Sequence, residues 1–209
     1  MKEQTDPEQY EEEDDGKSEE ELNTVKQQLD NEDFDVETQL VFTPDVAQTI
    51  DNAIIDYNCS ALLIVKPISE LRRQLIPVYD LNQLSKRFAT VIYELTQASD
   101  LPAELLFIES PEEEADEEEN EGRKDLSAMK EKAFGRLKQS GVDLNQIKSS
   151  SIQVENISEA VEKNSKEEDL LILVEANAKE REDLINRIRE EITEKIDCPL
   201  LVVLEERDA

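Results

Sequence analysis

The sequence predicts an α/β protein: a three-layer sandwich with a five-stranded parallel sheet, preceded by a partial α/β repeat and an acidic tail. Two observations predict this class. From Gln74 onward, short apolar segments typical of buried strands alternate with segments whose apolar residues recur at helical spacing. Earlier, a strand-helix-strand pattern between Val36 and Val65 parallels the pattern between Ser150 and Val174, which indicates a partial repeat of the same unit.

The N-terminal elements are predicted from capping and periodicity. Glu21–Leu29 is expected to form a short helix, and Val36–Phe42 alternates in the manner of a half-buried strand. Thr43-Pro44-Asp45 marks the start of a helix reaching Tyr57, since it offers a capping hydroxyl, a proline and a first-turn acid. Ala61–Val65 is apolar throughout, which predicts a strand buried on both faces of a parallel sheet.

The complete unit follows, with five predicted strands and four predicted helices. The strands are Gln74–Tyr79, Ala103–Glu109, Ser150–Asn156, Asp169–Val174 and Pro199–Glu206. The helices are indicated by the apolar stripes within Leu84–Leu95, Leu126–Leu137, Ile157–Val161 and Leu184–Ile196, the second of them ended by Gly141.

The charge of the chain excludes several partners. Its 209 residues include 53 acidic and 23 basic residues, for a net charge of -30, which repels nucleic acid and anionic lipid. Glu8–Glu21 and Pro111–Gly122 are acidic runs that we expect to be disordered, either binding a partner or cations or only keeping the chain in solution. No apolar run is long enough to insert into a membrane, so a cytoplasmic protein is expected.

The residue types also argue against catalysis. The chain has no histidine, which removes the usual general base and the common zinc ligands. Cys59 and Cys198 are far apart in sequence and form no metal or redox motif. The acidic runs lie in predicted disorder and cannot hold a preorganised site. We therefore expect no enzyme activity, no catalytic residue and no metal site.

Several motifs resemble the universal stress protein family. They are Leu75-Ile-Pro-Val in the first strand, Leu84-Ser-Lys-Arg, Glu104-Leu-Leu-Phe-Ile in the second strand and Cys198-Pro-Leu-Leu-Val-Val at the end. The resemblance implies a Rossmann-like fold. It divides the chain into an acidic disordered tail at 1–20, a partial repeat at 21–70 and a full domain at 73–206 with an acidic disordered insert at 111–122.

The resemblance also implies a degenerate nucleotide site. Nucleotide-binding members of the family have an acid after the first strand and a glycine-rich loop after the fourth, where backbone N–H groups approach phosphates. Here that loop reads Glu175-Ala-Asn-Ala-Lys-Glu, and the chain's four glycines lie elsewhere. Asp80 is a candidate ligand contact, but its preferred role is to cap the helix that follows. No cofactor is therefore expected.

The expected function is a non-catalytic regulatory or interaction module, in a stress response or associated with a transporter. A membrane transporter is a candidate partner because a fragment followed by a whole domain resembles the cytosolic tails of some transporters. The last strand would leave an unpaired edge, so we expect a homodimer through Leu200, Val202 and Leu204, or intramolecular pairing of the repeats. The alternative function is a nucleotide-binding universal stress protein that uses a departed loop.

Overall fold

The computed structural model describes residues 17–30, 37–39, 41, 43, 46–109, 126–154, 157–174 and 195–204. The chain divides into two compact units, Met1–Asn58 and Cys59–Ala209. The boundary falls inside the segment expected to form the partial repeat. Each unit is described by itself.

The smaller unit contains two helices. α2 spans Lys17–Asp30, so the helix predicted at Glu21–Leu29 is present and begins four residues earlier. α3 spans Val46–Asp56 and confirms the helix predicted after Pro44. The strand predicted at Val36–Phe42 is wrong at its described positions, 37–39 and 41, which belong to no strand. An alternating pattern forms a strand only beside another strand, and none is described in this unit.

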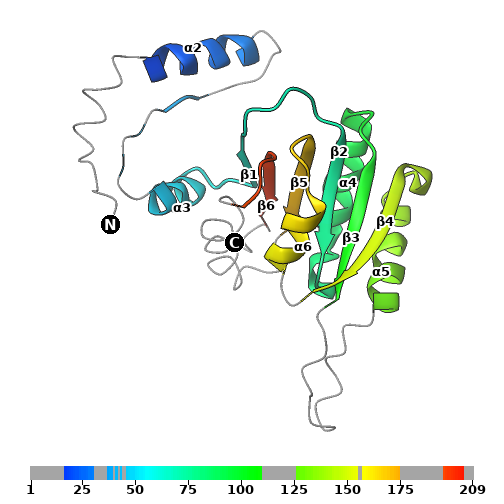
Figure 1. Cartoon of the computed structure of the whole chain (residues 1–209). Coiled ribbons are helices and arrows are strands. Elements are labelled where there is room, and N and C mark those ends of the chain that lie inside the picture. Colours follow the sequence, from blue (N-terminus) through cyan, green and yellow to red (C-terminus); the bar gives the residue numbers. More distant parts are fainter. Residues whose placement is uncertain are drawn as a thin grey trace. The chain divides into compact units, whose positions relative to one another are not determined.

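The larger unit is built on a six-stranded sheet (Figure 1). Its order is β1-β6-β5-β2-β3-β4. All pairings among the last five strands are parallel, as the sequence predicts, whereas β1 pairs with β6 in the antiparallel sense. The strands are β1 (Ala61–Ile64), β2 (Arg73–Val78), β3 (Ala103–Glu109), β4 (Ile147–Gln153), β5 (Asp169–Val174) and β6 (Leu200–Val203).

Helices cover both faces of this sheet. α4 (Lys86–Ala98) and α5 (Leu126–Gln139) lie on one face, and α6 (Ile157–Asn164) lies on the other (Figure 1). The helix predicted within Leu184–Ile196 falls almost entirely outside the described residues. No helix in the described part of the chain has the length and apolar character needed to cross a membrane.

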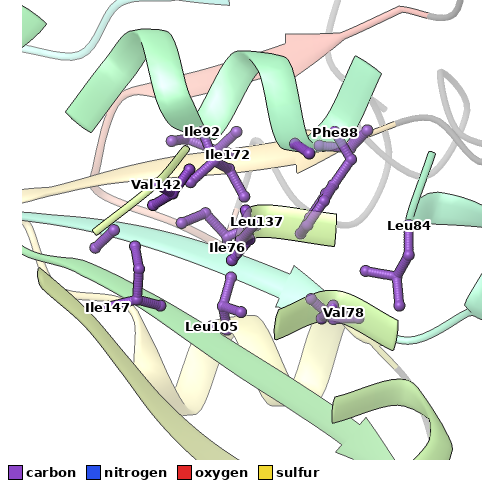
Figure 2. Close-up of a cluster of buried hydrophobic side chains, with 14 of the residues drawn as sticks. Ile76, Val78, Leu84, Phe88, Ile92, Leu105, Leu137, Val142, Ile147 and Ile172 are labelled. Atoms are coloured by element: carbon purple, nitrogen blue, oxygen red, sulfur yellow. The ribbon is translucent and has the colours of Figure 1, made fainter. Parts of the chain in front are cut away.

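The core between the sheet and α4 and α5 follows from strand alternation. Successive side chains of a strand point to opposite faces, so alternate residues of β2, β3 and β5 meet these two helices. Figure 2 shows strand residues Ile76 and Leu105 close to Leu137 of α5, with Phe88 of α4 in the same cluster. All four side chains are buried, which fixes both helices on the sheet.

Gly141 ends α5, as predicted. Its φ of +84° lies in the left-handed region that glycine adopts without steric cost. The N–H of Val142 donates to the carbonyl oxygen of Leu137 at 3.0 Å. The N–H of Gly141 donates to the carbonyl oxygen of Lys138 at 3.2 Å. These two bonds form a Schellman motif, which satisfies carbonyl groups that the helix end would leave unpaired.

β1 corrects two expectations. It is a strand, but it is not buried on both faces of a parallel sheet, because it lies at the sheet edge and its exposure alternates along its length. Leu63 is 55% exposed and Val65, just beyond the strand, is 74% exposed. A continuous apolar run therefore indicated a strand here without indicating its position in the sheet.

The unpaired edge expected at the last strand is not present, because β1 covers it. β1 pairs with β6 from Ala61 opposite Val203 to Ile64 opposite Leu200. β1 and β2 are separated by two strands, about 14 Å at the usual spacing. The intervening residues 65–72 can reach about 27 Å, so the connection is long enough. β1 therefore occupies the backbone edge of β6 within the chain.

Candidate functional site

The place to search for a ligand is the point where the sheet's connectivity reverses. β2 lies in the centre, with β3 on one side and β5 on the other. Connections leaving the carboxyl ends of such central strands run in opposite directions, and open α/β sheets bind ligands in the resulting crevice. β2 pairs with β3 as far as Val78, but its pairing with β5 ends at Leu75. The carboxyl ends of β2 and β5 are therefore not joined by ladder bonds.

Gln83 bridges these two strand ends with its side chain. Its Oε1 accepts from the backbone N–H of Tyr79 at 2.8 Å and of Asp80 at 3.0 Å, just beyond β2. Its Nε2 donates to the carbonyl oxygen of Val174, the last residue of β5, at 3.1 Å. The side chain is buried, with 1% of Gln83 exposed. Backbone groups that could face a ligand at this position are thus satisfied by the chain itself.

Local sequence holds Gln83 in this position. It ends a short 3-10 helix, η1 (Leu81–Gln83), whose N-cap is Asp80. The carboxylate of Asp80 accepts from the N–H of Asn82 at 2.7 Å, and Gln83 returns a bond to the Asp80 backbone, which completes a capping box. Ser85 then caps α4 by accepting from the N–H of Phe88 at 3.2 Å. Two consecutive caps fix the turn that carries Gln83.

Asp80 is a capping residue, as preferred from the sequence, but it caps η1, whereas Ser85 caps the helix α4 that follows. The cap bond of Asp80 is directed along its own chain segment. The glycine-free loop Glu175–Glu180 lies outside the described residues, as does the acidic insert Pro111–Gly122. The sequence alone therefore describes those two segments, which follow β3 and β5 in the chain.

Charge and ligand chemistry at this edge do not favour an anion. Asp80 follows β2, Glu109 ends β3 and Glu175 follows β5 in the sequence. Carboxylates near a phosphate repel it, with little screening where both are partly buried. Within the described ranges, no three Cys, Asp or Glu side chains are placed to hold a metal ion.

A second polar cluster lies at the amino ends of the central strands, opposite to the strand ends that Gln83 bridges. Arg73, the first residue of β2, forms a fork on Asp169, with its Nε donating to Oδ1 at 2.9 Å and a second, shorter contact to Oδ2. Its NH1 group donates to Oε2 of Glu104 at 2.8 Å. Ser150 donates to the other oxygen of Glu104 at 2.6 Å. The cluster therefore connects β2, β5, β3 and β4.

Every charge in this cluster is paired, which indicates a structural role. Burial alone would raise the pKa of Glu104, but the hydrogen bonds from Ser150 and Arg73 outweigh it and hold that pKa below its usual value. The hydrogen bond to Asp169 is the main cause of a raised pKa at Arg73, which keeps it charged at any ordinary pH. Burial raises the pKa of Cys198, so its thiol is poorly suited to act as a nucleophile.

Leu200, Val202 and Leu204, the residues expected to form a dimer interface, are buried within the chain. Val203 belongs to the core facing α4 and α5, so these three residues point to the opposite face of the sheet. The backbone edge expected to be free is the one that β1 covers.

Comparisons with known proteins return only solved structures. No protein-family model matches the chain, and no curated protein matches it. A crystal structure of a universal stress protein in complex with cAMP is 16% identical, with a TM-score of 0.43 over 63% of this chain and 96% of that one. A protein of that family from Burkholderia pseudomallei is 16% identical, with a TM-score of 0.39 over 68% and 100%. Both are proteins of the family that the sequence motifs resemble.

Proposed function

We propose that this chain is a non-catalytic regulatory or interaction module whose nucleotide crevice is closed by its own Gln83 side chain. The bridge from Gln83 to Tyr79, Asp80 and Val174 is the observation that carries the proposal. A ligand at this point would have to displace a buried amide and replace its hydrogen bonds. Leaving even one such group unpaired costs about 1–3 kcal/mol.

The sequence supports the same proposal independently. The loop after β5 has no glycine, so each residue there carries a side chain where a phosphate would need bare backbone. The absence of histidine supports the lack of catalysis, because general acid–base chemistry near neutral pH most often uses that residue.

The direct test is ligand-dependent stabilisation of the full chain. A ligand that binds only the native state raises the melting temperature by mass action. With millimolar ATP and magnesium we expect no shift beyond that given by magnesium and tripolyphosphate. Cyclic AMP is tested in the same way, because one solved neighbour is in complex with it. A rise of several degrees with either nucleotide would overturn the proposal and favour a nucleotide-binding stress protein with a departed loop.

Partners of the module are part of the proposal. A second copy and a membrane transporter are the candidates that follow from the sequence resemblance. While β1 covers β6, a second copy cannot pair with that edge. We therefore propose that a homodimer through β6 requires β1 to leave, and that the intact chain does not self-associate there.

A further inference from the structure

An open groove runs along the outer face of α5. Its volume is about 730 Å³. Most of its lining residues recur at helical spacing along one side of α5, from Ala128 to Gln139, a distance of about 16 Å or three turns at the usual helical rise. Leu81 of η1 forms its other wall. The lining is Leu81, Ala128, Glu131, Lys132, Gly135, Arg136 and Gln139.

Gly135 in this groove has no explanation within the fold. It lies inside α5, where glycine is less favourable than alanine. A Cβ at this position would meet nothing within 4 Å, so no neighbour among the described residues requires its absence. It is also not among the described residues with positive φ, unlike Gly141. Together with Ala128 two turns earlier, it leaves the floor of the groove low enough for another backbone to approach closely.

The lining of the groove has two basic residues, Lys132 and Arg136, against one acidic residue, Glu131, in a strongly acidic chain. α5 carries four basic residues against one acidic residue, while the whole chain has 23 against 53. Lys130 lies over the ring of Phe107 at 5.6 Å, and Lys132 donates to the carbonyl of Leu81 at 2.7 Å. The side chain of Arg136 makes no hydrogen bond or ion pair within the described part of the chain, so its guanidinium is available to a carboxylate.

We propose that this groove docks an acidic, amphipathic helix of a partner protein. A helix fits because the lining follows one side of α5 for about three turns and includes the small residues Ala128 and Gly135. Acidic side chains of the partner pair with Arg136 and Lys132, and its apolar stripe covers Leu81 and Ala128. The inference names a partner class for the interaction module proposed above and rests on that proposal.

Other occupants fit less well. Binding of nucleic acid requires several phosphate contacts. The chain's net charge of -30 would repel the phosphates that lie outside the groove. A small anion would not need a long open groove or the space above Gly135. Both remain distinguishable from a helix by experiment.

The test uses the full chain and a fluorescein-labelled helical peptide of about 18 residues, with Leu and Ala on one face flanked by Glu. A matched peptide has Gln in place of every Glu. Fluorescence anisotropy at about 0.05 M salt should show binding of the acidic peptide, and at least tenfold weaker binding of the Gln peptide. Binding should also weaken at about 0.5 M salt.

Three variants locate the peptide. Arg136→Gln should weaken binding about tenfold. Lys138→Gln removes the same charge from the same helix outside the groove, and should change binding less than about twofold. Gly135→Leu fills the floor of the groove and should abolish binding, while its melting temperature stays at or above that of the parent because leucine favours a helix.

Several results would overturn the proposal. These are no binding of the acidic peptide, equal binding of the Gln peptide, equal losses in the two charge variants, or unchanged binding by Gly135→Leu. Competition by tripolyphosphate or a short oligonucleotide at the peptide's own concentration would assign the groove to phosphate ligands instead. A large gain in affinity on replacing Pro111–Gly122 by a neutral sequence of equal length would assign it to that run. A nucleotide-dependent rise in melting temperature with normal peptide binding would refute only the closed crevice.

Discussion

At the residue scale, the amide side chain of Gln83 joins the carboxyl ends of β2 and β5 by hydrogen bonds. Gln83 satisfies two N–H groups after β2 and one carbonyl at the end of β5. The sequence contained the signal, because Asp80-Leu-Asn-Gln83 has the spacing of a capping box. Asp80 was predicted to cap from its identity alone. Gln83 could not be placed against Val174 from sequence, because that contact joins residues 91 positions apart.

Replacing Gln83 tests how much this bridge stabilises the larger unit. Gln83→Leu keeps similar volume but leaves three backbone groups without their partner. We expect the free energy of unfolding to fall by about 2–4 kcal/mol in urea denaturation. Gln97→Leu, at an exposed position of α4, is the control and should have little effect. Equal losses in the two variants would show that the bridge is not stabilising.

Glu104 gives a prediction of pH dependence. Its pKa is lower in the folded chain than the usual value, so its stabilising contribution is present above the unfolded pKa of about 4.3. That contribution is lost as the pH falls through the folded pKa. We expect Glu104→Gln to reduce the free energy of unfolding by about 1–2 kcal/mol near neutral pH.

The comparison is made by denaturation at several pH values. The difference between Glu104→Gln and the parent should shrink as the pH falls through and below about 4. Glu94→Gln makes the same change in net charge at an exposed position and serves as the control. A difference that stays constant with pH would contradict the assigned role of the Glu104 carboxylate.

At the element scale, periodicity identified the strands of the larger unit but did not show that β1 lies at the edge of the sheet. All five parallel strands were predicted because buried runs of apolar residues alternate with helical stripes. β1 was predicted as a strand for the same reason. Its edge position was not predictable, since Ala61–Val65 contains no charge or proline of the kind that usually marks an edge strand.

Gly135 lies inside α5 and Gly141 lies just after its end. Replacing each with alanine should change the free energy of unfolding in opposite directions. Gly135→Ala should raise the free energy of unfolding by about 0.5–1 kcal/mol, because it lies in a helix interior with open space beside it. Gly141→Ala should lower it by about 1–2 kcal/mol, because its φ is +84°. Thermal and urea unfolding measure both. A loss of stability in Gly135→Ala would reveal a neighbour that the structure does not have.

At the scale of the whole molecule, the parallel pairing of β2 to β6 follows from the alternation of strands and helices along the chain. The antiparallel pairing of β1 does not follow from that pattern. β1 and β6 lie about 140 residues apart in sequence, and no local pattern relates them. The smaller unit contributes no strand among its described residues.

Removing β1 should change the association of the molecule. A chain beginning at Ser69 lacks β1 and exposes the backbone edge of β6, which can then pair with a second copy. We expect light scattering to show dimers of this chain at micromolar concentration. A chain beginning at Cys59 lacks the smaller unit but keeps β1, and it should behave as the intact chain does. Monomers of both truncated chains would contradict a dimer through β6.

The pairing of β1 with β6 also constrains how the protein is made. β1 is synthesised about 140 residues before β6, its strand partner among the described residues. At a usual rate of 5–20 residues per second, the apolar segment waits about 7–30 s before it can dock. During synthesis it is therefore a natural target for chaperones, and this edge of the sheet can close only after β6 has been made.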